Sequence, residues 1–243
     1  MLGRAARASG GQRVRAAPVD GGRALPVAAP LRSALPGEGL RRGSTIAVQP
    51  SMSLLLALMA EASAGGAWCA LVGLPAVGLV AAEEAGLALD RVALVPHPGA
   101  DLVAVTSALL DGLDLVAVAG VDRMRADDRR RLVARARHRG AVLLPVGRWP
   151  GADLEVGTVG GRWHGLAGGG AGRLRCRQAS VRVGGRGAAH RGRVVPVLLP
   201  GPCGVVAEVG GAVAGASRSA EGPAEQSSGF VERAGSGTIR EAG

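Results

Sequence analysis

Lysine and tyrosine are absent from this sequence of 243 residues, and aromatic residues make up only 2% of it. Because all 29 basic residues are arginines, a lysine Schiff base, a serine–lysine dyad and a phosphate loop containing lysine are excluded. One Phe and three Trp are too few for a base-stacking platform. A hydrophobic fraction of 47% still predicts a buried core, which must consist mainly of Ala, Val and Leu.

Cysteine is also scarce. Cys69, Cys176 and Cys203 are odd in number and widely spaced, so they fit neither a disulfide framework nor a metal site. The basic amino terminus is followed by no continuous apolar run, and the uncharged stretch 62–82 is interrupted by Gly and Pro. We therefore expect a cytoplasmic protein without a membrane span, with association with the nucleoid as the alternative location.

The formal net charge of +10 is unevenly distributed along the chain. Residues 1–43 carry a net charge of +6, residues 44–120 carry −6, residues 121–193 carry +12 and residues 194–243 carry −2. A basic segment after an acidic one favours a surface that meets a polyanion. The alternative is that arginine serves as the general solvated residue in a protein without lysine.

Segments typical of strands and helices alternate along the middle of the chain. Strands are expected at residues 44–49, 68–72, 91–95, 113–119 and 141–146, and helices at 53–64, 77–85, 101–110 and 126–139. This alternation predicts an α/β fold, a mostly parallel sheet flanked by helices. Shorter strands at 154–159, 162–166, 173–183 and 194–199 predict an antiparallel extension of that sheet.

The chain is expected to fall into three regions. Residues 1–43 are predicted to form a basic flexible arm, residues 44–200 the core, and residues 201–243 a mostly disordered tail that is rich in Gly, Ala, Ser and Glu. Ser53 is the expected N-cap of the first core helix.

The connection between the first core strand and the first core helix is where a parallel α/β domain would bind phosphate. Its residues are Gln49, Pro50, Ser51, Met52 and Ser53. They include no Gly to let backbone N–H groups approach a phosphate and no Lys to neutralise it, and Pro50 removes one donor. We expect a degenerate phosphate loop.

Several stretches resemble a known family. The run GSTIAVQPSMSLLLALMAEASAGGAWCALVGLP is similar to the opening of a RecA-type core. With the runs RRRLVARARHRGAVLLPVGRWPGADLEV and RWHGLAGGGAGRLRCRQASVRV, it resembles the actinobacterial ImuA-type, RecA-like accessory proteins of the DNA-damage mutasome. The resemblance covers roughly residues 30–200. It implies an accessory role in the SOS response and mutagenic translesion synthesis, with a Y-family-like polymerase subunit and an error-prone polymerase as partners.

The sequence departs from RecA-type ATPases at each position that such catalysis needs. Leu74 and Pro75 stand where the water-activating Glu would follow the second strand. Ala119 and Gly120 replace the expected Asp, and Gly147 and Arg148 replace the residue that senses the γ-phosphate. We therefore expect no enzyme activity and no cofactor.

Arginines are concentrated on one predicted helix and on the strand and loop that follow later, and they are the candidate DNA-binding residues. They are Arg129, Arg130, Arg131, Arg135, Arg137, Arg139, Arg173, Arg175, Arg177, Arg182 and Arg186. A solvated helix face is the alternative reading.

Trp149 and Trp163 flank the predicted sheet extension and are candidate partner-binding residues, because Trp beside Arg is frequent at protein interfaces. Core packing is the alternative for both. The four His residues lack metal-ligand spacing, and Asp111 and Asp114 are expected to cap a helix–strand turn.

Three functions follow as hypotheses. The first is a non-catalytic RecA-like accessory protein that binds proteins, with DNA and a RecA-type protein as further candidate partners. The second is an active DNA-dependent ATPase of the RecA type. The third is a basic module that binds DNA or modulates recombination.

Overall fold

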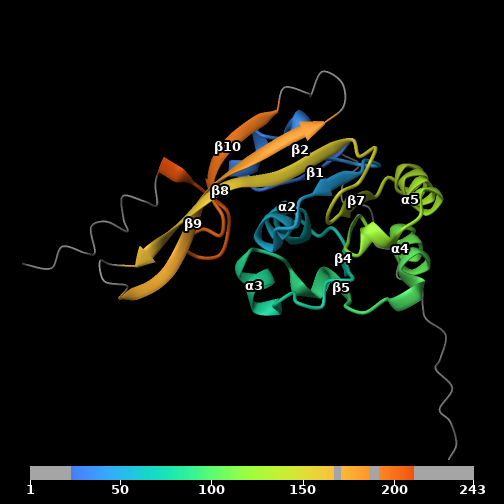
Figure 1. Ribbon diagram of the computed structural model, residues 1–243, viewed down its shortest axis with the longest axis horizontal. Helices are drawn as coiled ribbons and strands as arrows, with labels where there is room; N and C mark the ends of the chain where they lie inside the picture. The colour runs from blue at the N-terminus through green and yellow to red at the C-terminus, as the bar shows by residue number, and fades with distance from the viewer. Residues whose placement is uncertain (1–22, 167–170, 186–191, 211–243) are drawn as a thin grey trace, which may run out of the picture.

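A four-stranded parallel sheet forms one half of the fold. The computed structural model describes residues 23–166, 171–185 and 192–210. In spatial order the strands are β5 (Val92–Val95), β4 (Cys69–Val72), β6 (Leu115–Val118) and β7 (Val142–Pro145) (Figure 1). Every residue of β4, β6 and β7 is buried, whereas β5 is partly exposed at the edge. Such continuous apolar runs are typical of strands covered on both faces.

A second, five-stranded sheet continues the first. Its order is β11 (Ala207–Glu208), β10 (Arg193–Leu198), β9 (Gly172–Gly185), β8 (Leu154–Leu166) and β3 (Ile46–Val48). β3 pairs with β8 in parallel, and all other pairs are antiparallel. Parallel bridges from Thr45 to Leu143 and from Val48 to Val146 join β3 to β7. The first core strand therefore lies between β7 and β8.

Helices cover both faces of the parallel sheet. α2 (Met52–Ala64) and α3 (Leu79–Glu84) share a buried cluster with Leu71 and Ala117. α4 (Leu102–Leu110) and α5 (Ala126–Arg139) pack with Val72 and Val118, which alternate with those residues along the same strands. Because successive strand residues point to opposite faces, the two clusters lie on opposite sides of the sheet.

Residues 23–43 were expected to belong to the flexible arm, but the structure packs them against the core. β1 (Ala24–Pro26) pairs with β2 (Gly39–Arg41), and α1 (Ala29–Arg32) lies between them in the chain. Leu25, Leu31 and Leu40 are fully buried in the α2 cluster. These leucines have no helical or strand period, so the sequence pattern gave no sign that they would be buried. Residues 1–22 of the predicted arm lie outside the described residues.

The first residues of the predicted disordered tail, 201–210, are also ordered against the core. The β11 segment pairs with β10, and the Gly201 N–H donates to the Val205 carbonyl at 3.0 Å. Residues 211–243 are not described. Short 3-10 turns complete the backbone at Pro36–Glu38, Leu89–Arg91, Gly99–Asp101 and Val121–Arg123.

The predicted α/β class is confirmed, with a parallel sheet, an antiparallel extension and flanking helices. Two local predictions were wrong. Residues 154–166 form one strand with register shifts after Val159 and His164, rather than two strands. The N-cap of α2 is Ser51 rather than Ser53, because the Ser51 hydroxyl accepts the Leu54 N–H at 3.4 Å. In the described part of the chain, no helix is long and apolar enough to cross a membrane.

Candidate functional site

The carboxyl ends of β3, β7 and the first residues of β8 surround a cavity of about 500 Å³. This is the edge at which open parallel sheets bind ligands. Gln49 and Pro50, from the predicted degenerate loop, line it, together with Gly147, Arg148 and Glu155. Glu155 was not among the site residues predicted from the sequence. The sequence offered one indication of its exposure. Glu155 stands between Leu154 and Val156 on a predicted strand, where alternation places it on the face opposite Val156.

The β3–α2 connection is short, and hydrogen bonds to β8 and to the first turn of α2 hold it in place. β3 ends at Val48 and α2 begins at Met52, so only three residues connect them. The Gln49 N–H donates to the Val156 carbonyl at 2.8 Å, and the Ser51 hydroxyl accepts the Leu54 N–H. A phosphate loop instead needs several free backbone N–H groups in a longer, glycine-rich turn.

The side chain of Gln49 occupies the space beside β8. An added Cβ at Gly157 would overlap the Gln49 amide, so the two residues are in direct contact. The Gln49 side chain thus lies against β8, and the three-residue connection forms no glycine-rich phosphate cradle. Met52 and Ser53 are already part of α2.

The strand ends at which the sequence resemblance would place catalytic groups are occupied by backbone pairing. The Gly73 N–H donates to Val95, the Ala119 N–H to Val72, and the Gly147 N–H to Val48, at 2.8–2.9 Å. Gly73, Ala119 and Gly147 thus lie at the ends of β4, β6 and β7. Each contributes a backbone hydrogen bond there, and none supplies a carboxylate.

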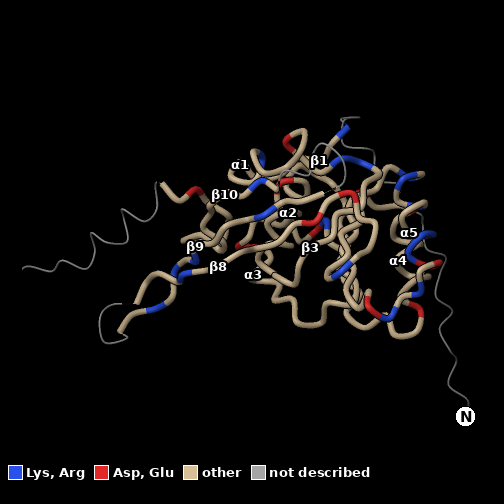
Figure 2. The backbone as a smooth tube through the Cα atoms, turned by 45° about the horizontal axis from the view of Figure 1, so that its top comes forward, with Lys and Arg blue, Asp and Glu red and all other residues tan. Residues whose placement is uncertain are grey.

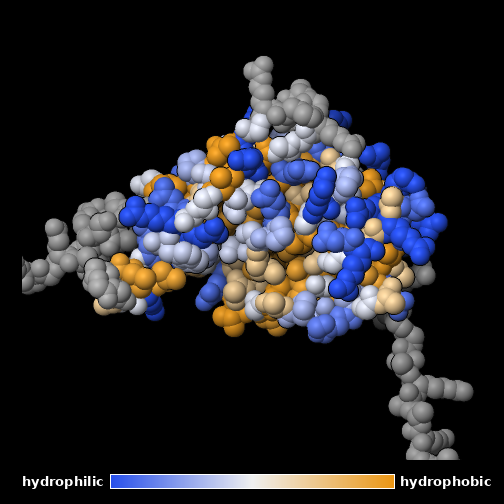
Figure 3. Space-filling view, viewed as in Figure 1, coloured by the Kyte–Doolittle hydropathy of each residue, from blue (hydrophilic) through white to orange (hydrophobic). Residues whose placement is uncertain are grey.

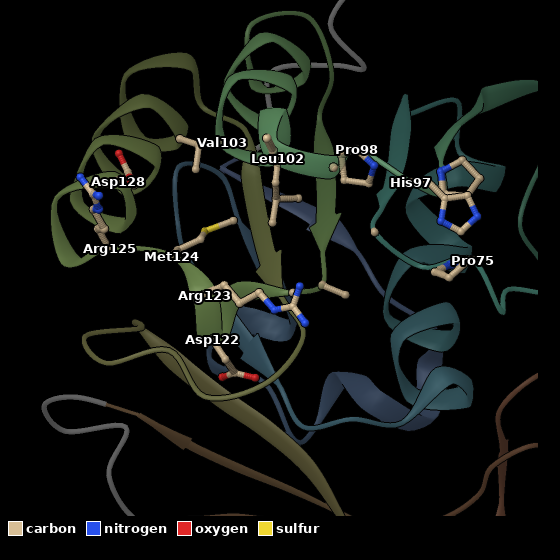
Figure 4. Close-up of a pocket in the computed structure, with 16 residues that line it drawn as sticks. Pro75, His97, Pro98, Leu102, Val103, Asp122, Arg123, Met124, Arg125 and Asp128 are labelled. Atoms are coloured by element: carbon tan, nitrogen blue, oxygen red, sulfur yellow. The ribbon is translucent and has the colours of Figure 1, made fainter.

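A larger cleft of about 920 Å³ lies farther along the same edge, between the loops that follow β4, β5 and β6 (Figure 4). Leu102, Val103 and Met124 form an apolar wall, and the Arg123 side chain extends across the cleft. His97, Arg125, Asp122 and Asp128 add charged or titratable groups. No sequence pattern indicated this cleft, because its residues come from three loops without a shared motif.

Most predicted DNA-binding arginines on α5 make contacts within the fold. Asp111 at the end of α4 accepts hydrogen bonds from Arg135 and Arg139, the latter at 3.1 Å. The Arg135 hydrogen bond holds the pKa of the Asp111 carboxyl below its usual value. Asp111 therefore fastens α4 to α5 rather than acting only as a turn residue.

The remaining α5 arginines differ in their surroundings. Arg130 pairs with Asp127, and Arg131 lies 3.8 Å from Asp128. Arg129 stacks over the Trp149 ring at 5.7 Å and donates to the Val121 carbonyl at 3.0 Å. Among the residues that the structure describes, Arg137 makes no ion pair.

The β9 arginines form a separate group. Arg173, Arg175 and Arg182 are exposed, whereas Arg177 is half-buried and donates to the Gly160 carbonyl at 2.9 Å. Arg186 lies outside the described residues. The basic positions of α5 and those of the β8–β9 hairpin lie at opposite ends of the molecule (Figure 2). The fold does not bring the predicted set together into one patch.

The two candidate partner-binding tryptophans differ. Trp149 is only 1% exposed and packs in the α4–α5 cluster, so its assignment to a partner surface was wrong. A chain with so few aromatic residues uses its large indole to fill core volume, and Arg129 covers it. Trp163 on β8 is 48% exposed and stays a candidate.

Asp114 has a structural role at the opposite edge of the sheet. It accepts the Trp68 N–H at 3.0 Å and pairs with Arg42 at 2.8 Å.

Of the cysteines, Cys69 and Cys176 are buried, Cys203 is exposed, and all three are free. Burial raises the pKa of the Cys69 thiol to about 12, which makes it unreactive. The described ranges hold no cluster of His, Cys, Asp or Glu that could bind a metal.

A family model and a mycobacterial relative each match part of this chain. Residues 33–151 match the family model described as the MT3502 N-terminal domain. The uncharacterized protein Rv3395c of Mycobacterium tuberculosis is 40% identical over 116 residues, which are 47% of this chain and 57% of that protein. The chain thus matches little more than half the length of this relative. The family match includes the β3–α2 connection and the larger cleft, and it ends before the β8–β9 hairpin. Neither description states an activity.

Proposed function

We propose that this protein is a non-catalytic, RecA-like accessory protein of the DNA-damage response that acts in translesion synthesis by binding other proteins. The observation that carries the proposal is the three-residue β3–α2 connection, in which Gln49 contacts Gly157 in place of a glycine-rich phosphate cradle. Without such a cradle and without lysine, the chain lacks the groups that position and neutralise a nucleoside triphosphate.

The arrangement of strands supports the RecA-like part of the proposal. β3, the first strand of the parallel set, lies inside the sheet between β7 and β8, and α2 follows directly from its carboxyl end. RecA-type cores likewise carry their nucleotide loop at the end of an interior first strand. This topology is compatible with the resemblance and supports the RecA-like part of the proposal.

The partners in this proposal follow from the resemblance. They are a Y-family-like polymerase subunit and an error-prone polymerase of the mutasome, with a RecA-type protein as a further candidate. The exposed Trp163 supports protein binding, because partly exposed Trp near Arg is common at interface hot spots.

DNA binding is a second candidate function, and one observation favours it. Arg123, Arg125 and Arg148 stand on loops at the carboxyl edge of the sheet, and none has an ion pair within the described ranges. An electrostatic DNA interface would lose affinity steeply as salt rises. An affinity for duplex or single-stranded DNA that is insensitive to salt would contradict it.

The main proposal is tested by co-purification. The tagged full-length chain is expressed in its host, DNA is damaged, and the recovered proteins are quantified by mass spectrometry against an untagged control. We expect enrichment of a Y-family-like polymerase subunit. Recovery of neither a polymerase nor a RecA-type protein would contradict the mutasome assignment.

A further inference from the structure

The β8–β9 hairpin extends beyond its neighbours in the sheet (Figure 1). β3 pairs with β8 only at Leu154–Val156, and β10 pairs with β9 from Gln178 to Val183. We call residues 157–166 and 172–176 the distal hairpin. Within the described ranges, the outer edges of the distal hairpin pair with no other strand. Open edges present unpaired N–H and C=O groups that can accept an added strand.

Large apolar side chains are exposed on the distal hairpin. Val159 is 41% exposed, Trp163 48%, Leu174 52% and Leu166 54%. Hydrophobic residues gather at the end of the hairpin next to strongly hydrophilic ones (Figure 3). Several exposed large apolar residues on one projecting element are typical of a surface that another molecule covers.

The charge of this region has one sign. Between Glu155 and Glu208 the sequence contains eight arginines and no acidic residue. Arg162, Arg173 and Arg175 on the distal hairpin are exposed and have no ion pair in the described part of the chain. This surface therefore complements an acidic partner and repels a basic one.

We propose that the distal hairpin binds an extended segment of a partner protein in which acidic side chains alternate with apolar ones. The acidic side chains would pair with Arg173 and Arg175 on one face of the hairpin, and the apolar ones would cover Leu166 and Leu174 on the other. The backbone of the segment would add to an open edge of the hairpin. The proposal deepens the proposed function, on which it rests for the existence of a protein partner.

Two other occupants fit the hairpin less well. A nucleic acid would satisfy the arginines but would leave the aliphatic side chains uncovered, and one Trp is no platform for several bases. A second hairpin of the same chain would bring like charges together, which opposes pairing. An acidic and apolar protein segment satisfies both the charge and the apolar surface.

The test uses the full-length chain and a fluorescein-labelled peptide of twelve residues in which Glu and Asp alternate with Val and Leu. Fluorescence anisotropy measures its affinity beside two control peptides. One has the same composition with the acidic residues in a single block, and the other has Gln and Asn in place of the acids. We expect micromolar binding of the alternating acidic peptide, at least tenfold weaker binding of both controls, and weakening with salt.

Three variants locate the binding surface. Arg173→Glu combined with Arg175→Glu, and separately Leu174→Ser, should each weaken the affinity for the peptide by about tenfold or more. Arg137→Glu is the matched control, because Arg137 is exposed on α5 at the other end of the molecule, and it should change the affinity less than twofold. Circular dichroism verifies that each variant is folded.

Four results would overturn the proposal. The first is equal binding of the control peptides, and the second is equal binding by the hairpin variants. The third is competition by oligothymidylate for the peptide that the hairpin variants abolish. The fourth is a dimer in sedimentation velocity that Leu174→Ser dissociates. If the wild-type protein does not bind the peptide but still recovers a polymerase, only the hairpin assignment is rejected. Peptide binding without polymerase recovery would reject the mutasome assignment alone.

Discussion

The Gln49 side chain lies against Gly157 at the carboxyl end of the β3–β8 pair, so closely that a Cβ at position 157 would overlap the Gln49 amide. This contact joins the shortened β3–α2 connection to the neighbouring strand. Gly157 is buried, and its backbone is extended, so the glycine is required here for space rather than for a left-handed conformation.

Replacing this glycine tests the contact. Gly157→Ala should lower the free energy of unfolding by about 1–3 kcal/mol, because the added methyl group must displace Gln49 or shift the strand. Urea denaturation measures the change. Gly184→Ala on β9 is the control, since an added Cβ there meets nothing within 4 Å, and it should be nearly neutral.

A second substitution assigns the cost to Gln49. In the Gly157→Ala background, Gln49→Ala should recover most of the lost stability, whereas alone it should have little effect because Gln49 is exposed. The double-mutant cycle should therefore show a strong interaction between the two positions. Additive effects would mean that Gln49 does not occupy the space beside Gly157.

The two tryptophans should respond differently to truncation. Trp149→Ala should lower the free energy of unfolding by about 3–5 kcal/mol, because it removes a fully buried indole. Trp163→Ala should change it by no more than about 0.5 kcal/mol, because the side chain is half exposed. Trp149→Phe offers a milder test if the alanine variant does not fold. Equal effects at the two positions would contradict the assignment of Trp149 to the core.

Asp114 should contribute to stability through two partners. Asp114→Ala leaves the Trp68 N–H and the half-buried Arg42 guanidinium without their acceptor, so a loss of about 2–3 kcal/mol is expected. Urea denaturation measures it, with Asp90→Ala as the exposed control. A loss as small as that of the control would show that residues 23–43 are not fastened to the sheet through this carboxylate.

The Asp111 contacts predict a dependence on pH. Because Arg135 and Arg139 lower the pKa of Asp111 in the folded protein, its stabilising contribution is complete above about pH 4, the usual value for Asp. The contribution is lost as the pH falls through the lowered pKa. The stability difference between the wild type and Asp111→Asn should thus be present at pH 7 and disappear in stronger acid. Asp122→Asn, which removes no ion pair seen in the described residues, should produce no such difference.

Much of this fold could be predicted from the sequence. β4, β6 and β7 are continuous apolar runs, and α5 combines acidic residues in its first turn with basic ones in its last, so period and capping identify them. The segment 23–43 could not be predicted, because Leu25, Leu31 and Leu40 are buried by tertiary contacts without any local period.

The site could be predicted only in part. The missing glycines and lysine of the β3–α2 connection are visible in the sequence, but its closure by Gln49 depends on a strand more than a hundred residues away. The separation of the α5 and β9 arginines depends in the same way on sheet order. Trp149 and Trp163 have similar sequence surroundings, and only packing distinguishes the buried one from the exposed one.

We propose that the protein binds no nucleoside triphosphate at the β3–α2 connection. Titration of the full-length chain into fluorescent mant-ATP with Mg²⁺, with competition by unlabelled ATP, tests it most directly. We expect no saturable binding in the micromolar range. Saturable micromolar binding that unlabelled ATP displaces and that Arg148→Ala weakens would contradict the account.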